Sequence, residues 1–282
     1  MTPAAMNEKF GISGQLRFVA HASGLIIAEF ATATLCLQGA HLMTWNPGEV
    51  PVLWLSPDAR LQPGKPIRGG VPICWPWFGA HPAGLGMHGY ARTTPWQVIE
   101  SATRLVLAMN TEATSAVALR LTVIVGESLR MALCTTNAGS SDFHYSEALH
   151  SYFRIGDIAA ASISGLAGSQ YWDTVGEVTL KKQAETIRFS AETDQVYINT
   201  AAACEIMDEI LQRRILVSKS GSLSTVVWTP WTAKAQRMGD LGQPEGWREM
   251  LCVESANAFE NSLTLAPGCS HTLEVEYRIF AG

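Results

Sequence analysis

The stretch from residue 117 to residue 134 alternates apolar and polar side chains more regularly than any other part of the chain. Val or Leu occupies positions 117, 119, 121, 123 and 125, with Arg120 and Thr122 between them. A Gly-Glu-Ser turn follows at 126–128, and the alternation resumes from Leu129. Successive side chains of a strand point to opposite faces, so this pattern predicts an antiparallel hairpin with one buried face. Burying such a face requires a layered, sheet-based fold.

Similar short runs make up most of the remaining 282-residue chain. Apolar and β-branched runs punctuated by turn residues occupy 25–30, 35–45, 52–55, 96–100, 104–110, 143–153, 158–163, 179–189, 195–199, 215–218, 224–228, 250–254 and 273–280. Many short strands with closely spaced turns are typical of an antiparallel sandwich. No β-α-β alternation is present, which disfavours a doubly wound fold. We therefore predict an all-β fold, a large antiparallel β-sandwich with few short helices.

Three segments fit this pattern less well. Residues 1–14 carry little periodicity and are expected to form a loose N-terminal lead-in to a single domain over 15–282. Residues 201–214 have a helix-forming composition, so either a helix or a pair of strands is compatible with them. Residues 233–240 are predicted to form a short helix, because Lys, Ala, Gln, Arg and Met cluster there.

Composition narrows the classes of partner. The formal net charge of −5 argues against nucleic acid. No run of 18 apolar residues and no secretory signal pattern is evident, so we expect no membrane association. The cysteines at 36, 74, 134, 204, 252 and 269 form no C-x-x-C pair. They are therefore expected to be buried thiols of a cytoplasmic protein, and no zinc motif is recognisable.

The stretch from Pro63 to Arg92 is rich in proline and glycine yet also carries several Trp, Phe and Tyr residues. Neither a helix nor a long central strand can run through it. Its aromatic side chains require burial, so it is not a flexible linker. A stiff loop that also carries Arg68, His88 and Arg92 has the character of a binding-site wall. Guanidinium groups bind phosphate or carboxylate well, so an anion is the expected ligand.

Two segments of this loop resemble a known family. Ile67-Arg-Gly-Gly-Val-Pro-Ile-Cys-Trp-Pro-Trp-Phe-Gly79, followed by His88-Gly-Tyr-Ala-Arg92, is similar to motifs of the hexose-6-phosphate mutarotases. These enzymes, also called glucose-6-phosphate 1-epimerases, belong to the aldose 1-epimerase (galactose mutarotase-like) superfamily. The resemblance covers residues 15–280 and implies that superfamily's large, curved β-sandwich. It also favours two strands, joined near 208–212, over a helix in 201–214.

The resemblance implies an isomerase that interconverts the α and β anomers of a hexose 6-phosphate. Such a reaction needs an acid and a base across the sugar, and neither a metal nor an organic cofactor. Ala148-Leu-His150-Ser-Tyr-Phe153 resembles the family's Ala-Leu-His-x-Tyr-Phe motif, which makes His150 the expected acid. Cys252-Val-Glu254 resembles the motif that carries the catalytic base, which makes Glu254 the expected base. A structural histidine and a salt-bridged glutamate are the alternatives.

The resemblance implies four substrate-binding residues. Arg68 and Arg92 would hold the 6-phosphate, while His88 and Asp194 would bind sugar hydroxyls. The alternatives are arginines that brace the loop, a histidine that ties down its own loop, and an aspartate that initiates a turn. The weaker candidates are Arg60 and Lys65 for the anion site and Asp157 for the sugar. Trp228 and Trp231, in a motif similar to the family's Val-Trp-Asn-Pro-Trp, fit the core better than the sugar site.

The sequence therefore predicts a cytoplasmic, monomeric glucose-6-phosphate 1-epimerase that acts on a small sugar phosphate without a cofactor. Two rival hypotheses remain open. One is an epimerase of unphosphorylated aldoses, in which the arginines serve another purpose. The other is a sugar-phosphate-binding module that does not catalyse, although both expected proton-transfer positions are filled.

Overall fold

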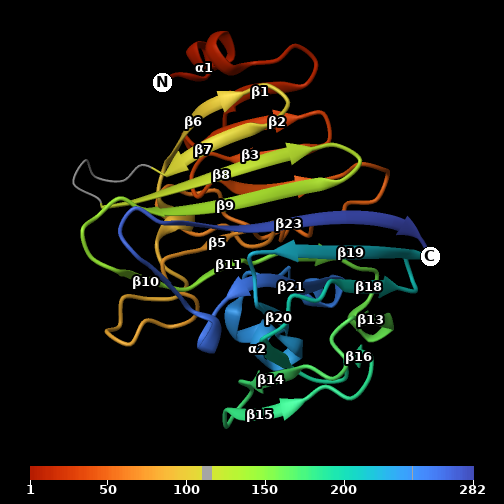
Figure 1. The fold of residues 1–282 in the computed structure, drawn as a ribbon. Helices are drawn as coiled ribbons and strands as arrows, with labels where there is room; N and C mark the ends of the chain where they lie inside the picture. The colour runs from red at the N-terminus through yellow and green to blue at the C-terminus, as the bar shows by residue number, and fades with distance from the viewer. Residues whose placement is uncertain (110–115, 243) are drawn as a thin grey trace.

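The computed structural model describes residues 1–109, 116–242 and 244–282. Two large antiparallel sheets dominate it (Figure 1). The all-β prediction is therefore confirmed. The strand expected over 104–110 is β7 (Leu105–Met109), and the last residue of that expected range, Asn110, lies outside the described residues.

The first sheet has nine strands, in the order β16-β13-β18-β19-β23-β9-β8-β7-β6. Its strands, in chain order, are β6 (Trp96–Ser101), β7, β8 (Val117–Val125), β9 (Leu129–Asn137), β13 (Ala161–Ser164), β16 (Ile187–Arg188), β18 (Cys204–Asp208), β19 (Arg213–Ser220) and β23 (Ser270–Ala281). The hairpin expected from the alternation at 117–134 is β8 and β9, paired from Val125 and Leu129 outward.

The second sheet has eight strands, in the order β15-β14-β17-β20-β21-β11-β5, with β12 paired to β21 as well. They are β5 (Ile73–Cys74), β11 (Glu147–Leu149), β12 (Tyr152–Arg154), β14 (Gln170–Asp173), β15 (Thr179–Lys182), β17 (Thr193–Ile198), β20 (Ser224–Thr229) and β21 (Met250–Asn257). Every residue of β21 is buried, so this strand is covered on both faces.

Smaller elements complete the fold. A four-stranded sheet contains β1 (Leu16–Ala20), β2 (Ile26–Phe30), β3 (Ala33–Cys36) and β4 (His41–Trp45), and a two-stranded sheet contains β10 (Phe143–Tyr145) and β22 (Leu263–Leu265). The helices are α1 (Pro3–Phe10), α2 (Trp231–Met238) and the short 3₁₀ turns η1 (Ala91–Thr93), η2 (Ile158–Ala160), η3 (Gly246–Glu249) and η4 (Phe259–Asn261). Neither α-helix of the described residues has the length and apolar character needed to cross a membrane.

The main hydrophobic core is shared by the two large sheets. Leu133 and Tyr277 of the nine-stranded sheet belong to the same buried cluster as Val227 and Val253 of the eight-stranded sheet. Phe153 meets Tyr277 edge to face, with ring centroids 5.1 Å apart. Buried aromatic and aliphatic side chains of this kind supply most of the free energy that holds two sheets together. Both large sheets therefore contribute to one buried cluster.

The N-terminal residues depart from the expected loose lead-in. Thr2 caps α1, with its hydroxyl accepting from the amide of Ala5, and a proline begins the helix. Such a start is favourable because the first amides of a helix lack partners within it. Met6 and Phe10 are buried in the main core. The expectation was wrong because two apolar contacts with the body of the protein, invisible in local periodicity, hold this short helix in place.

Some expected strands are divided. The run 143–153 forms three strands, β10, β11 and β12, and the run 179–189 contributes β15 and β16 to different sheets. Residues 52–55 form only isolated bridges to Gly69 and Phe153. In contrast, 201–214 forms the two strands favoured by the resemblance, β18 and β19. The expected helix at 233–240 is α2, which begins at Trp231 and ends before the left-handed Gly239.

Candidate active site

A cavity of about 610 Å³ lies on the side of the eight-stranded sheet that faces away from the main core. The floor comes from strands of that sheet, one wall from the loop at 66–92, and the opposite wall from α2 and the residues after it. The residues that line the cavity include Arg68, His88, Arg92, His150, Tyr152, Asp194, Trp228, Lys234, Asp240 and Glu254. All six residues proposed from the sequence therefore line one cavity.

The strand register explains how distant parts of the chain meet on this floor. Asp194 of β17 pairs with Trp228 of β20, which pairs with Cys252 of β21, which pairs with Tyr152 of β12. Residues two apart on a strand share a face. The next row on the same face therefore contains Glu254, opposite Val226. The intervening residues point into the main core.

Glu254 and His150 are in direct contact. Their nearest atoms, Oε1 of Glu254 and Nε2 of His150, are 3.3 Å apart. The Glu254 side chain is 1 % exposed and the His150 side chain 11 % exposed. Oε2 of Glu254 and Nδ1 of His150 are buried and have no hydrogen-bond partner among the described residues. Since buried polar atoms are normally paired, these atoms mark a place where a ligand can supply the partners.

His150 lies between β11 and β12, not inside the continuous strand expected from the sequence. Its backbone amide donates to the carbonyl of Pro72 at 3.0 Å. Its ring stacks on that of Tyr152, with centroids 4.7 Å apart and planes 7° apart. The two side chains thus share a side, as strand alternation predicts. The stack fixes the plane of the imidazole, a requirement for directed proton transfer.

Burial shifts both members of the pair toward their neutral forms. Burial raises the pKa of Glu254 well above that of an ordinary glutamate, and the negative charge of Asp194 acts in the same direction. Burial lowers the pKa of His150 well below 6.5, with His88, Arg68 and Arg92 adding to the effect. Desolvation penalises the charged form of any side chain, which explains the opposite directions of the two shifts. The alternative of a salt-bridged glutamate at the rim does not fit the position of Glu254, because its side chain is 1 % exposed and its nearest partner is the ring of His150.

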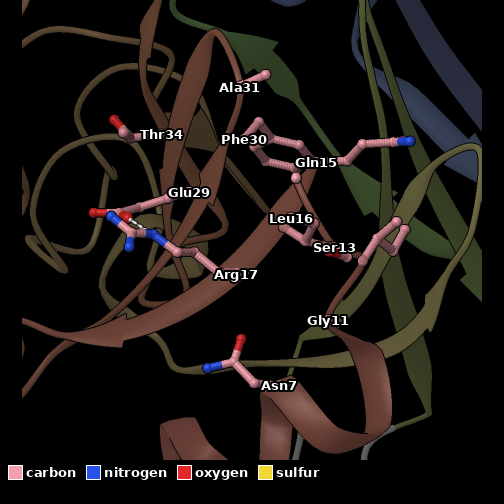
Figure 2. A pocket seen from close by; sticks show the side chains of 12 residues that line it. Asn7, Gly11, Ser13, Gln15, Leu16, Arg17, Glu29, Phe30, Ala31 and Thr34 are labelled. Atoms are coloured by element: carbon pink, nitrogen blue, oxygen red, sulfur yellow. Dashed lines mark hydrogen bonds and ion pairs between the residues drawn. The ribbon is translucent and has the colours of Figure 1, made fainter.

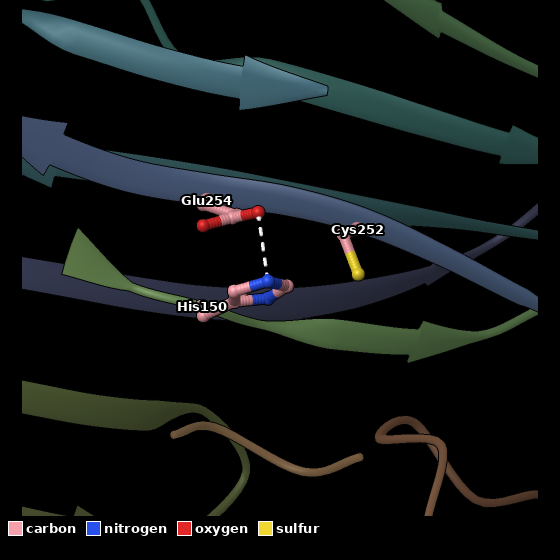
Figure 3. A group of neighbouring side chains, drawn as sticks. All are labelled: His150, Cys252 and Glu254. Carbon is pink, nitrogen blue, oxygen red and sulfur yellow. Dashed lines mark ion pairs between the residues drawn. The ribbon is translucent and has the colours of Figure 1, made fainter. Parts of the chain in front are cut away.

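A third side chain stands beside this pair. Figure 3 shows Cys252 next to His150 and Glu254, with a ligand atom of each within 4.8 Å of the other two. The thiol of Cys252 is fully buried, and burial raises its pKa well above 9.0, with Glu254 adding to the effect. The thiol is thus protonated near neutrality and is not an activated nucleophile.

The loop that forms one wall is held by glycine backbone geometry. Gly89 has φ +66°, and a Cβ there would lie 1.9 Å from the carbonyl oxygen of Trp75. Any other residue at this position would clash with the backbone. Its neighbour His88 also lies in the left-handed region, at φ +61°. A non-glycine residue in this region is strained, and such strain tends to occur at functional sites.

His88 is bonded to its own loop and also lines the cavity. Its Nδ1 accepts from the backbone amide of Gly79 at 3.2 Å, so the histidine does tie down its own loop. The neutral ring then carries its proton on Nε2, which makes that atom a hydrogen-bond donor. Burial lowers the pKa of His88 to about 3, with Arg92 and Arg68 adding to the effect. The ring lines the cavity with its centroid 5.6 Å from that of His150.

Two partners orient Arg68. Its Nε lies 3.1 Å from Oδ2 of Asp240, and its Nη1 donates to the hydroxyl of Tyr152 at 2.8 Å. The same Tyr152 supports the ring of His150 from below. The arginine and the imidazole are therefore held by one buried aromatic residue. This shared support couples the position of the cation to that of the proton-transfer pair.

Arg92 has a different set of contacts. Its Nη2 donates to the carbonyl of Met87 at 2.6 Å, and its Nε is buried without a hydrogen-bond partner in the described part of the chain. Burial lowers the pKa of Arg92, and the positive charge of Arg68 acts in the same direction. A buried cation that is repelled by a second cation is stabilised when an anion binds between them. This is the physical signature of an anion site.

Asp194 lies at another part of the cavity, beside Lys234 of α2. Their nearest atoms are 3.5 Å apart, and Lys234 Nζ also lies 2.9 Å from a carboxylate oxygen of Glu192. Burial raises the pKa of Asp194, while Lys234 opposes the rise. Asp194 is the second residue of β17, and its backbone carbonyl accepts from the amide of Thr174, the residue after β14, so its backbone belongs to a strand and does not fit the turn alternative. Its carboxylate remains at the cavity wall.

Sequence reasoning missed three cavity residues, Tyr152, Lys234 and Asp240. The available signals were the motif at 148–153, which contains Tyr152, and the helix expected at 233–240, which contains Lys234 and Asp240. Among the weaker candidates, Arg60 and Lys65 do not line the cavity.

The remaining candidates have structural contacts. Asp157 caps η2 through Ala159 and pairs with Arg248 at 2.7 Å. Trp231 packs against Trp247 as core, whereas Trp228 is buried and also lines the cavity.

A second hollow of similar size lies far from these residues in the chain. This N-terminal groove, of about 690 Å³, is lined by Asn7, 11–17, 29–31 and Thr34. Figure 2 shows its side chains, with Arg17 paired to Glu29 at 2.5 Å. The Asn7 side chain bonds both the amide and the carbonyl of Phe18. Asn7, Arg17 and Glu29 thus have partners within the protein.

Known proteins match the chain over most of its length. The family model described as aldose 1-epimerase matches residues 25–278. A protein of Escherichia coli K12 named "Putative glucose-6-phosphate 1-epimerase" is 37 % identical over 247 residues, which cover 81 % of this chain and 80 % of that protein. A protein of Cenchrus ciliaris with the same name is 34 % identical over 263 residues, covering 86 % and 79 %.

Solved structures of similar proteins superpose on this chain over most of its length. The crystal structure of a "putative mutarotase (YeaD) from Salmonella typhimurium" superposes with a TM-score of 0.86 at 30 % identity, covering 97 % of this chain and 96 % of that one. A structure from Synechocystis, Slr1438, superposes at a TM-score of 0.73 with 20 % identity and supports the fold alone, covering 96 % and 97 %. The family match over residues 25–278 confirms the resemblance read from the motifs, and the chain belongs to the aldose 1-epimerase family.

Proposed function

We propose that this protein interconverts the α and β anomers of a hexose 6-phosphate, with glucose 6-phosphate as the expected substrate. The single observation that carries the proposal is the buried contact between Glu254 and His150 beside Arg68 and Arg92. Acid–base groups and an anion site in one cavity are what ring opening of a sugar phosphate requires. The names of the E. coli and Cenchrus ciliaris relatives point to the same substrate.

The separation of the two groups suits the chemistry. From the sequence we expected them on opposite sides of the sugar, yet they are neighbours. The hydroxyl O1 and the ring oxygen O5 of a pyranose are bonded to the same carbon, C1. An acid and a base that serve O1 and O5 must therefore be adjacent to one another. A sugar with its C1 edge against the pair brings both oxygens within reach.

The steps conserve protons and electrons. Glu254 takes the proton of the C1 hydroxyl, the C1–O5 bond breaks with its electrons moving to O5, and His150 gives O5 a proton. The product is the open aldehyde, which rotates about C1–C2. On closure His150 takes the O5 proton back, O5 attacks the other face of C1, and Glu254 returns a proton to O1. Catalyst and cavity are regenerated without a co-reactant.

Glu254 and His150 must together hold one proton before the ring can open. Their environment favours a state with one proton, on Glu254. A protonated Glu254 with neutral His150 has the same net charge as an ionised Glu254 with protonated His150. One transfer across the contact converts the first state into the second, so no exchange with solvent is required. Closely coupled groups of this kind titrate as a unit.

The phosphate contributes to this conversion. The positive charges of Arg68 and Arg92 are among the causes that lower the pKa of His150. A dianion bound by the arginines cancels that influence, so His150 holds a proton more readily in the complex than in the free enzyme. The phosphate thereby promotes catalysis as well as binding. His88 and Asp194 would orient hydroxyls of the sugar through their donor and acceptor groups.

We expect the enzyme to be monomeric and cytoplasmic. We also expect it to need no cofactor, because ring opening requires proton transfer alone.

Exchange NMR of the two anomers of glucose 6-phosphate tests the proposed reaction, with unphosphorylated glucose as the matched substrate. We expect faster exchange for the phosphate ester, and loss of that exchange in Glu254→Gln and in His150→Ala. Equal kcat/KM for both sugars would identify a free-aldose epimerase. Tight binding without exchange would identify a binding module.

A further inference from the structure

Cys252 has no task in the proton transfers proposed above, yet it lies among the groups that perform them. Its Sγ, a ring nitrogen of His150 and a carboxylate oxygen of Glu254 all lie within 4.8 Å of one another (Figure 3). Cys252 is 0 % exposed, Glu254 1 % and His150 9 %. Three different ligand types converge here, two from the single strand β21 and one from the connection between β11 and β12, about a hundred residues earlier in the chain.

The spacing is close to that of a metal site. Tetrahedral zinc binds sulfur, nitrogen and oxygen ligands at about 2.0–2.3 Å, which places neighbouring ligand atoms about 3.3–3.7 Å apart. The three ligand atoms now lie within 4.8 Å of one another. Side-chain rotations that displace these atoms by less than about 2 Å would bring their separations into that range. Three protein ligands with an open fourth position are the usual arrangement of an accessible zinc site. His150 and Glu254 line the cavity, so that position can face it.

The charge and the unpaired atoms also suit a divalent cation. Zinc bound to a thiolate and a carboxylate leaves the buried site with no net charge, which limits the cost of desolvation. A thiol that coordinates a metal is deprotonated even when it is protonated beforehand, and its proton is released to solvent. Glu254 Oε2 is buried and has no partner among the residues described, so it can accept the ion without breaking a hydrogen bond.

We infer that His150, Cys252 and Glu254 form a binding site for a soft divalent cation such as zinc, and that the bound ion inhibits the enzyme. The ion occupies the lone pairs that accept the sugar protons, so ion and sugar phosphate exclude one another. Binding of the ion follows from the geometry of the three side chains, whereas its inhibition of the enzyme rests on the proposed epimerase function.

Cobalt(II) is the probe for binding, because a thiolate bound to cobalt gives an intense near-ultraviolet charge-transfer band. The protein to titrate is the full chain with Cys269→Ser, which removes the exposed cysteine. We expect a one-to-one titration with that band, displaced by zinc. The band should be absent in Cys252→Ser and retained in Cys74→Ser, whose buried thiol belongs to the same sheet but not to the trio.

Zinc inhibition of anomer exchange is the second readout. We expect inhibition that is competitive with sugar phosphate, reversed by EDTA, and weakened at least about 100-fold in Cys252→Ser, since even an outer partner of a metal ligand contributes 10–100-fold. Basal exchange should persist in that variant, because the thiol takes no part in the reaction.

The two readouts separate the possible failures. A cobalt thiolate band in a protein without epimerase activity would support the site and remove the proposed function. Absence of the band in the Cys269→Ser protein would overturn the site, whether or not Cys252→Ser folds. Equal zinc inhibition of Cys252→Ser and its parent would show that zinc acts elsewhere, and would overturn the inference as well.

Discussion

The active-site cavity and the N-terminal groove are nearly equal in volume, about 610 and 690 Å³, and differ in almost every other respect. In the groove, Arg17 is paired with Glu29, and its side chain is 71 % exposed. In the cavity, Glu254 and Arg92 each have a buried polar atom that lacks a partner in the described regions. The difference shows that size does not identify a site. The two hollows differ in that four residues of the cavity, Arg92, His150, Asp240 and Glu254, have such unpaired atoms and no described residue that lines the groove does.

Among substitutions in the cavity and in the groove, replacement of the proposed base is expected to have the largest effect on the reaction rate. Glu254→Gln keeps the shape of the side chain and removes its ability to take a proton, so kcat should fall about 10²–10⁴-fold. Exchange NMR of glucose 6-phosphate measures this, with circular dichroism and thermal unfolding as controls for the fold. A variant that keeps more than half of the wild-type kcat would show that the unpaired carboxylate is not the base.

The anion site is expected to show the next largest effect. Arg92→Met preserves much of the side-chain length and removes the charge, which at roughly 1.5–3 kcal/mol per charge-assisted bond lowers kcat/KM for glucose 6-phosphate about 10–100-fold. The value for unphosphorylated glucose should change little. The comparison of the two substrates is the measurement. Equal losses for both would mean that Arg92 shapes the loop at 63–92 and does not bind phosphate.

The pH dependence should follow from the opposite pKa shifts of the pair. The active state holds one proton, so activity falls where His150 gains a second and where Glu254 loses the only one. Because the pKa of His150 is lowered, the acid limb of kcat/KM should lie well below 6.5. Because that of Glu254 is raised, the alkaline limb should lie well above 4.5. Each limb should change the rate about tenfold per pH unit.

The profile is measured with spontaneous anomer exchange subtracted, and with glucose as a substrate whose charge does not change in this range. Bound phosphate should move the acid limb of kcat to higher pH than that of kcat/KM. An acid limb near 6.5 in the free enzyme would contradict the buried, cation-facing environment of His150.

The smallest effect is expected in the groove. Arg17→Ala removes an exposed ion pair, which contributes about 0–1 kcal/mol to the free energy of unfolding. Anomer exchange should be unchanged. Urea denaturation and the exchange assay are the measurements. A loss of activity in a variant of normal stability would show that the groove has a role that its satisfied polar groups do not suggest.

Much of this molecule could be predicted from its sequence. The β8–β9 hairpin follows from alternation alone, because its period reflects burial on one side. The six site residues came from motif resemblance, and the structure brings all of them to one cavity. Their roles remain proposals.

Other features depend on contacts between distant segments. No local pattern shows that α1 packs its Met6 and Phe10 into the core. Nor does one show that Cys252 lies beside His150, about a hundred residues earlier in the chain, because the pairing of Tyr152 with Cys252 brings them together. Tyr152 and Asp240, which orient Arg68, were missed for the same reason.

The row of paired residues that runs from Asp194 through Trp228 and Cys252 to Tyr152 has a consequence for how the protein folds. A shift of one residue in the pairing of β20 or β21 would turn that strand's member of the row, Trp228 or Cys252, toward the interior. A molecule with that error would contain all the correct residues and no functioning centre. The specific activity of a refolded sample therefore measures the fraction of chains in which these strands are paired in the native register.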